Sequence, residues 1–221
     1  MKNVLVIAAH PDDEVIGCGG TIAKHKRAGD KIHLLYMTDG ISSRGNIEFQ
    51  QKNIREVGVK NFIDYLKPES NKILNLPDNS MDSISLLEIV KEIESVISDT
   101  KPDIIYTHSA KDLNIDHRIT LEATLVATRP QNSDSVKEVY SFFINSSSEW
   151  NFGVEPFKPN LYVDITDEIA EKEKFLAFYA DEMRAAPHAR SISNIINTAS
   201  VNGATVGVKY AEVFEILREC R

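Results

Sequence analysis

The chain has 221 residues, of which 42 % are hydrophobic and 26 % are charged, and its formal net charge is −8. This composition is typical of one globular domain, and an acidic chain without a basic run is not expected to bind the phosphate backbone of nucleic acids. No apolar stretch approaches the roughly 20 residues of a membrane span, no secretory leader is recognisable, and only two cysteines, Cys18 and Cys220, are present. We therefore expect a soluble, cytoplasmic protein.

The first part of the chain predicts a strand, a helix and a second strand. An apolar run over residues 4–9 predicts a buried strand, residues 19–28 have helix-forming composition, and residues 31–38 form the next apolar run. This succession is typical of a βαβ unit in a parallel sheet.

The remainder of the chain continues to alternate between strands and helices. Further strands are predicted at 72–76, 102–108, 136–144, 161–165 and 210–217, and helices at 47–60, 83–98, 117–127, 167–183 and 193–202. The alternation predicts an α/β fold in which a mostly parallel sheet is covered on both faces, with antiparallel additions in the last third and 210–217 as an edge strand. No internal repeat or linker divides the chain, so we expect one domain over residues 1–221.

Polar side chains follow the first and fourth predicted strands at the points where these strands end. His10, Asp12 and Asp13 follow the first strand, and His117 lies in the polar stretch after the fourth. In open α/β sheets, ligands bind beyond the carboxyl ends of the strands. Two imidazoles and one carboxylate, His10, Asp13 and His117, would leave a divalent ion an open position for water, as in catalytic zinc sites. Asp12 is then available as a general base, or alternatively caps a helix that begins near residue 19.

Other polar or reactive side chains have weaker assignments. The glycines at 17, 19 and 20 do not complete a dinucleotide fingerprint, which needs a glycine where this chain has Ile22, and Cys18 is better explained as a small buried residue than as a nucleophile. Three residues are candidates for substrate contacts, and each has a purely structural alternative: Arg44 in a polar loop, Trp150 after a strand, and His188 in the carboxyl-terminal part. His108, at the end of the fourth strand, is a candidate neighbour of the site.

The segment Ala-His-Pro-Asp-Asp-Glu at residues 9–14 and the Asp-His pair at 116–117 resemble the two signature motifs of the PIG-L/LmbE family of N-deacetylases. Residues 76–78, 184–191 and 210–214 are similar to further stretches of that family. The resemblance implies a single-domain, Rossmann-like three-layer sandwich that binds Zn²⁺ or another divalent metal. It also implies that His10, Asp13 and His117 are the ligands and that Asp12 is the base that activates the attacking water.

The chain departs from the family pattern at Asn114, where many members have a histidine. Asn cannot titrate, but its amide can donate a hydrogen bond to a developing oxyanion, so Asn114 is predicted to keep the polarising role. Asp112 and Asp116 are expected to orient ligand imidazoles.

The resemblance implies hydrolysis of the N-acetyl group of a small-molecule amino sugar or glycoconjugate, which releases acetate and a free amine. Alternatives are hydrolysis of another amide, such as an N-formyl group or a thiol-conjugate amide, and a non-catalytic sugar- or metal-binding module. The presence of Asp12 argues against a binding module, because metal binding alone needs no base. The sequence leaves a homo-oligomer open.

Overall fold

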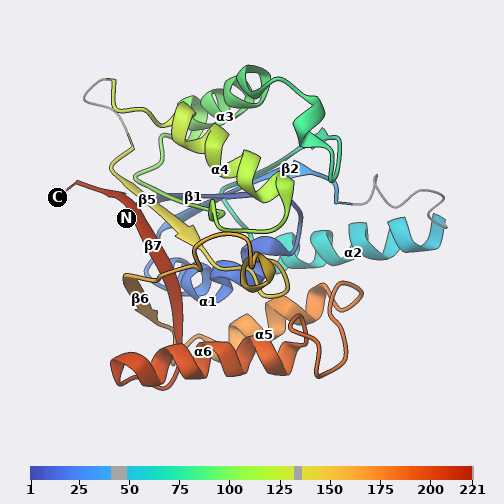
Figure 1. The fold of residues 1–221 in the computed structure, drawn as a ribbon, viewed down its shortest axis with the longest axis vertical. Coiled ribbons are helices and arrows are strands. Elements are labelled where there is room, and N and C mark those ends of the chain that lie inside the picture. Colours follow the sequence, from blue (N-terminus) through green and yellow to red (C-terminus); the bar gives the residue numbers. More distant parts are fainter. Residues whose placement is uncertain (41–48, 132–135, 221) are drawn as a thin grey trace.

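The computed structural model of the protein describes residues 1–40, 49–131 and 136–220. One sheet in the order β3-β2-β1-β4-β5-β7-β6 lies between two layers of helices (Figure 1). Its strands are β1 (Asn3–Ala8), β2 (Lys31–Thr38), β3 (Ser70–Leu76), β4 (Ile104–Thr107), β5 (Glu138–Phe142), β6 (Leu161–Asp164) and β7 (Ala211–Glu219). The helices are α1 (Asp13–Arg27), α2 (Phe49–Leu66), α3 (Leu86–Thr100), α4 (Ile115–Ala127), α5 (Ile169–Phe178) and α6 (Ile192–Val206).

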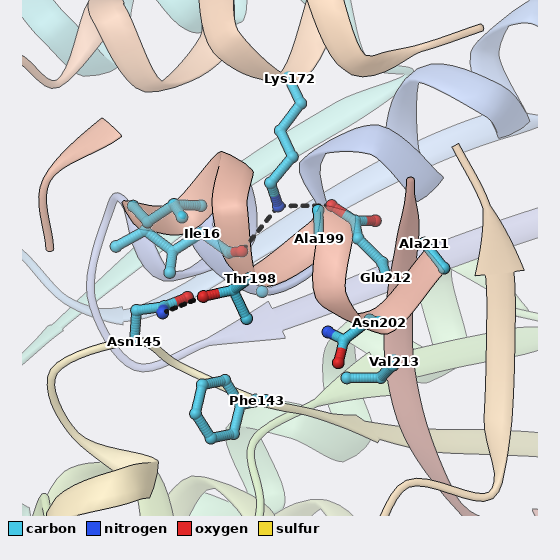
Figure 2. A pocket seen from close by; sticks show the side chains of 12 residues that line it. Ile16, Phe143, Asn145, Lys172, Thr198, Ala199, Asn202, Ala211, Glu212 and Val213 are labelled. Atoms are coloured by element: carbon cyan, nitrogen blue, oxygen red, sulfur yellow. Dashed lines mark hydrogen bonds and ion pairs between the residues drawn. The ribbon is translucent and has the colours of Figure 1, made fainter. Parts of the chain in front are cut away.

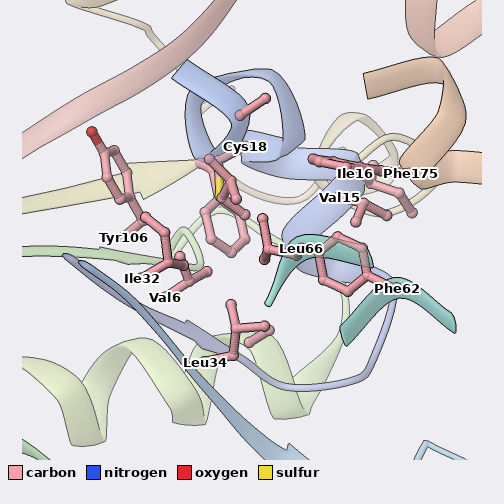
Figure 3. Packing of buried hydrophobic residues seen from close by; sticks show 14 of the residues in the cluster. Val6, Val15, Ile16, Cys18, Ile32, Leu34, Phe62, Leu66, Tyr106 and Phe175 are labelled. Atoms are coloured by element: carbon pink, nitrogen blue, oxygen red, sulfur yellow. The ribbon is translucent and has the colours of Figure 1, made fainter. Parts of the chain in front are cut away.

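The alternation of side chains along β1 explains the two helix layers. Val4 and Val6 point into a core shared with α1, α2, α5 and α6, whereas Leu5 and Ile7 point into a second core under α3 and α4. Figure 3 shows part of the first core, where Val6 lies among residues from α1, β2 and α2. Because both faces of β1 are buried, the strand reads as a continuous apolar run. Among the described residues, no helix is long and apolar enough to cross a membrane.

The predicted α/β class and mostly parallel sheet are confirmed, but one strand was misplaced. β1 to β5 pair in parallel, and β7 runs antiparallel to both β5 and β6. The segment 210–217 was expected at an edge, yet β7 lies inside the sheet, and β6 and β3 take the edges. Long-range pairing decides this order, and local sequence carries no signal for it.

Helix α1 begins at Asp13 rather than near residue 19, and it is broken at Cys18, whose backbone is non-helical. Lys172 Nζ donates to the carbonyl oxygens of Val15 (3.2 Å) and Ile16 (2.8 Å) before the break. The Glu212 carboxylate accepts the backbone N–H groups of Gly20 (2.8 Å) and Thr21 (2.7 Å) after it. Figure 2 shows this buried Lys172–Glu212 pair beside α1. The pair satisfies the backbone groups that the break would leave without partners.

Three other helices differ clearly in length from their predictions, and one of them, α6, continues to Val206 rather than residue 202. α2 continues to Leu66 instead of ending near residue 60, because Phe62 and Leu66 are buried in the core that α5 also contributes to. α5 ends at Phe178 rather than at residue 183. The residues that follow α5 form a turn, in which the N–H of Glu182 and that of Met183 both donate to Tyr179 O, and this turn brings Glu182 to the candidate site.

Candidate metal and catalytic site

The site lies beyond the carboxyl ends of neighbouring parallel strands. β1 and β4 pair directly, so the segment after β1 meets the loop that leads from β4 into α4. The turn after β3 supplies Asp78 and Asn79, and the segment after β5 supplies Ser146 and Ser147. Together these segments line a cavity of about 150 Å³. Its position agrees with the rule that ligands of open α/β sheets bind at this end of the strands.

Three buried donor atoms converge on one point of this cavity. Asp13 Oδ2 lies 3.2 Å from His10 Nδ1 and 3.3 Å from His117 Nε2, and the two ring nitrogens are 3.3 Å apart. Ligand atoms placed tetrahedrally at zinc distances are separated by about 3.3 Å, so the three edges of this triangle match. Asp13 Oδ1 is also buried and accepts no hydrogen bond within the described residues. The donor chemistry and the spacing fit a divalent metal ion.

The outer nitrogens of both imidazoles face carboxylates. His10 Nε2 lies 3.2 Å from Asp116 Oδ2 and 3.2 Å from Asp78 Oδ1, and His117 Nδ1 lies 3.0 Å from Asp112 Oδ1. A proton held on each outer nitrogen leaves the two inner nitrogens with lone pairs directed at the triangle, which is the arrangement typical of metal-binding histidines. Both predicted orienting residues, Asp112 and Asp116, therefore lie beside the imidazoles.

His10 with Asp78 and Asp116 forms a second close group of potential ligands on the other side of the ring. The Asp116 carboxylate already accepts the backbone N–H groups of Asn79 at 2.7 Å and Met81 at 3.1 Å. Each Asp116 oxygen therefore already has one backbone donor, whereas Asp13 keeps one oxygen, Oδ1, that accepts no hydrogen bond within the described residues. This difference favours an orienting role for Asp116 over direct ligation.

The carboxylates make the site strongly attractive to a cation. Burial lowers the pKa of His10, but Asp116, Asp13 and Asp78 outweigh this effect and raise it well above its ordinary value. Burial also opposes protonation of His117, yet Asp13 and Asp112 raise its pKa to about 9. The raised pKa values indicate an excess of negative charge around both rings. A divalent ion held by the neutral imidazoles would neutralise that charge in place of the extra protons.

Asp12 lies outside the triangle and faces the same cavity. It occupies the N-cap position of α1, but its side chain makes no capping bond, so the helix-cap alternative is wrong. Its Oδ2 accepts from Arg190 Nη1 at 3.1 Å and lies 3.8 Å from Arg55 Nη2. Burial raises the pKa of Asp12 to about 6 against the lowering effect of Arg190 and Arg55. A carboxylate with a pKa close to neutrality suits a general base.

Asn114 lines the cavity and caps α4. Its Oδ1 accepts from the backbone N–H of Asp116 at 2.8 Å, and its Nδ2 donates to Asn79 Oδ1 at 3.1 Å. The amide oxygen is therefore committed to the cap, whereas the amide nitrogen donates one N–H to Asn79, another lining residue, and keeps a second N–H.

Two of the three candidates for substrate contacts, Trp150 and His188, lie farther out. Trp150 and His188 contact each other edge to face, with ring centroids 5.7 Å apart, and His188 Nδ1 accepts from the backbone N–H of Arg190. Neither ring belongs to the cavity lining, although Arg190 does. Trp150 is 41 % exposed, so it does not serve as a core residue. Arg44 lies outside the described residues.

Sequence reasoning missed the buried arginine of the site. Arg55 is only 4 % exposed, and it donates to Gly40 O (2.7 Å), Glu182 Oε1 (2.8 Å) and Pro11 O (2.8 Å). It comes from a mostly polar helical stretch with no motif, and its partner Glu182 lies far along the chain, so no local signal could have found it. Arg190 lies in residues 184–191, and the only sequence signal of that segment is its similarity to the family.

His108 packs against His117 on the side away from the cavity lining. Its ring stacks on His117 with the centroids 3.9 Å apart, and its Nε2 accepts the backbone N–H of Ala9 at 2.8 Å. Burial and the neighbouring His117 lower the pKa of His108 well below its ordinary value. It is therefore a neutral residue that packs against the site.

Residues 5–128 match the model of the family described as PIG-L, GlcNAc-PI de-N-acetylase. The chain is 28 % identical over 184 residues to the diacetylchitobiose deacetylase of Thermococcus kodakarensis. The matched region covers 78 % of this chain and 67 % of that protein.

Two solved structures show the same fold. The N,N'-diacetylchitobiose deacetylase of Pyrococcus horikoshii superposes with a TM-score of 0.77 at 24 % identity, over 98 % of this chain and 84 % of that one. GalB, the 4-carboxy-2-hydroxymuconate hydratase of Pseudomonas putida, also gives 0.77, at 20 % identity, over 100 % and 98 % of the two chains. Because a deacetylase and a hydratase share this fold, the residues at the strand ends must decide the reaction.

Proposed function

This chain belongs to the PIG-L (GlcNAc-PI de-N-acetylase) family of deacetylases, and we propose that it is a metal-dependent N-deacetylase of small N-acetylated amino sugars or glycoconjugates, formed by one domain over residues 1–221. One observation carries the proposal. The triangle of His10, Asp13 and His117 stands beside a further buried carboxylate, Asp12, which faces the same cavity without belonging to the triangle. This division supplies both a set of metal ligands and a separate base.

In this proposal, His10, Asp13 and His117 hold a divalent ion such as Zn²⁺. When bound, the ion would polarise the amide carbonyl and make water more acidic. Asp112 and Asp116 keep the two imidazoles oriented through their outer nitrogens. The contacts among the three residues support this ligand role.

Asp12 moves the proton in the proposed reaction. It takes a proton from the attacking water, whose oxygen bonds to the acyl carbon, and returns that proton to the nitrogen as the C–N bond breaks. The products are acetate and a free amine. Arg190, which donates to Asp12 at 3.1 Å, fixes the direction of this carboxylate.

The size and lining of the cavity favour a short acyl group on a polar molecule. A volume of about 150 Å³ among His, Asp, Asn, Ser, Glu and Arg side chains suits an acetamide and neighbouring hydroxyls better than a long aliphatic chain. N-formyl and thiol-conjugate amides fit the same description, and an N-formyl amine is tested alongside. A non-catalytic binding module is disfavoured, because it would have no use for a buried base beside the ligands.

The function is tested by incubating the Zn²⁺-loaded protein with N-acetylglucosamine, N,N'-diacetylchitobiose and an N-formyl amine. We expect equimolar release of acetate and primary amine from at least one N-acetyl sugar. Protein carrying Asp12→Asn, prepared in the same way, controls for contaminating deacetylases. Release of neither product from any N-acyl compound by fully loaded protein would refute the proposal, and hydration of an unsaturated acid would instead favour the reaction of GalB.

Asn114 is predicted to stabilise the oxyanion. Loss of one such donor typically lowers the maximal rate by about 10²–10³-fold with little effect on substrate affinity, because the bond strengthens only as charge develops. Asn114→Ala should show this loss, but it also removes the cap of α4. Asn114→Ser retains a good N-cap and should lose the same rate with less effect on the melting temperature.

Steady-state kinetics and thermal unfolding of both Asn114 variants separate the two roles. A rise in KM alone would mean that Asn114 binds the ground-state substrate. Wild-type kcat in the Ser variant would mean that only the cap matters.

A further inference from the structure

The peptide bond between Pro11 and Asp12 is held at both ends by buried charged side chains. Its carbonyl oxygen, Pro11 O, accepts from Arg55 Nη2 at 2.8 Å. Its N–H, on Asp12, donates to Glu14 Oε2 at 3.0 Å. Both side chains are almost fully buried. The orientation of this one peptide plane is therefore fixed from two directions.

Asp12, whose N–H belongs to this peptide, has an unfavourable backbone conformation. Asp12 has φ 123°, in a region that residues with a Cβ rarely adopt, and its own carbonyl oxygen accepts from Val15 and Ile16 to begin α1. Such conformations persist only where the surroundings enforce them, and they concentrate at functional sites. Here the result is that two successive side chains, Asp12 and Asp13, both line the cavity.

Both carboxylate oxygens of Glu14 accept hydrogen bonds, and Glu14 does not line the cavity. Oε2 accepts from the Asp12 N–H, and Oε1 accepts at 2.7 Å from the hydroxyl of Tyr179, the residue that follows α5. Glu14 is fully buried and does not belong to the cavity lining. It therefore does not contact substrate, and its direct link to the candidate base is the hydrogen bond from the Asp12 N–H.

We propose that Glu14 is a positioning residue, which accepts the Asp12 N–H and so keeps the Asp12 carboxylate directed into the cavity. The kinetic consequence rests on the proposed function of Asp12 as the base. The effect of Glu14 on the backbone conformation of Asp12 does not rest on that function, and it can be measured on protein that has no activity.

The first test compares glycine with alanine at position 12. Both variants remove the carboxylate, but only glycine adopts a φ of 123° without strain, so Asp12→Gly should have a higher denaturant midpoint than Asp12→Ala. In a Glu14→Met background the backbone can relax, so the difference should vanish or reverse, since glycine loses more entropy on folding. In a Glu14→Gln background, where an acceptor oxygen is retained, the difference should persist.

Two further variants keep this test decisive if Glu14→Met is too unstable to fold. Tyr179→Phe removes only the hydroxyl that anchors Glu14, and it should reduce the glycine–alanine difference in part. Glu168→Met removes another buried carboxylate, one that pairs with Arg27 and has no contact with the Pro11–Asp12 peptide, and it should leave the difference unchanged. A difference that is equal in the wild-type, Glu14→Met and Tyr179→Phe backgrounds would overturn the proposal.

The second test measures turnover. Glu14→Met should lower kcat by about 10–10²-fold, the order of loss caused by a misplaced catalytic group, with KM and metal content close to wild type. In an Asp12→Asn background the same substitution should cost nothing more, because Glu14 acts through the Asp12 carboxylate. Glu14→Gln should retain most of the wild-type kcat.

An equal further loss of kcat in the Asp12→Asn background, or a parallel loss of metal, would mean that Glu14 supports the fold or the ligands and not the base. If wild-type protein deacetylates nothing while the glycine–alanine difference behaves as described, the proposed function fails and the positioning role of Glu14 stands.

Discussion

Replacing Asp12 by Asn is expected to lower turnover by roughly 10²–10⁴-fold, the usual contribution of general acid–base catalysis, without loss of the metal. Asn has nearly the same size, and its Oδ1 can still accept the hydrogen bond from Arg190, which lies 3.1 Å from Asp12 Oδ2. What it cannot do is take a proton from water. The measurement combines kcat with metal content by elemental analysis after dialysis.

Asp13→Asn is the matched control for this experiment, because it makes the same chemical change one residue along the chain. Asp13 Oδ2 stands in the triangle with both imidazoles, so this variant should lose metal as well as activity. If Asp12→Asn instead strips the metal and Asp13→Asn keeps it, the ligand and the base have been exchanged.

The convergence of His10, Asp13 and His117 was predictable from the sequence, because it depends on a rule of topology and on local patterns. An apolar run places His10 and Asp13 at the end of β1, and another places the segment before His117 at the end of β4. The carboxyl ends of parallel strands in one sheet meet at the same edge, so residues about a hundred positions apart come together without any knowledge of side-chain packing.

The burial of Arg55 and the break in α1 were not predictable, because both depend on contacts between residues that are far apart in the sequence. No recognisable sequence pattern indicates these contacts. In the sequence, Arg55 is one of several polar residues in a predicted helix. Its burial at the site becomes evident only from its hydrogen bonds to Pro11 and Glu182. The break in α1 needs Lys172 and Glu212, which come from α5 and β7. A buried charge is recognised by its partners, and a one-dimensional sequence does not reveal which distant residues those are.

Alanine at any of the three triangle positions is expected to reduce metal binding more than loss of an orienting residue does. Removal of an outer partner of a ligand histidine typically costs about 10–100-fold in metal affinity, and loss of a ligand should exceed this. His10→Ala, Asp13→Ala and His117→Ala should therefore leave little metal after dialysis. Asp112→Asn should fall within the smaller range, because it changes the partner of His117 Nδ1 and leaves the three triangle residues in place. The Oδ1 of the introduced asparagine can still accept from one of the other donors around this position, which are Ser147, Ser148 and the N–H of Asn114.

The same titrations distinguish the two groups of ligands around His10. If the ion occupies the Nδ1 side, Asp78→Ala should weaken metal binding only as an outer partner does, because Asp78 Oδ1 faces His10 Nε2. If it occupies the Nε2 side, Asp78→Ala should abolish binding and His117→Ala should leave it intact. Full metal occupancy in all three triangle variants would contradict the assignment. The triangle is the expected side, since all three of its edges, 3.2–3.3 Å, match tetrahedral ligation, and since Asp13 Oδ1 accepts no hydrogen bond within the described residues, whereas both Asp116 oxygens do.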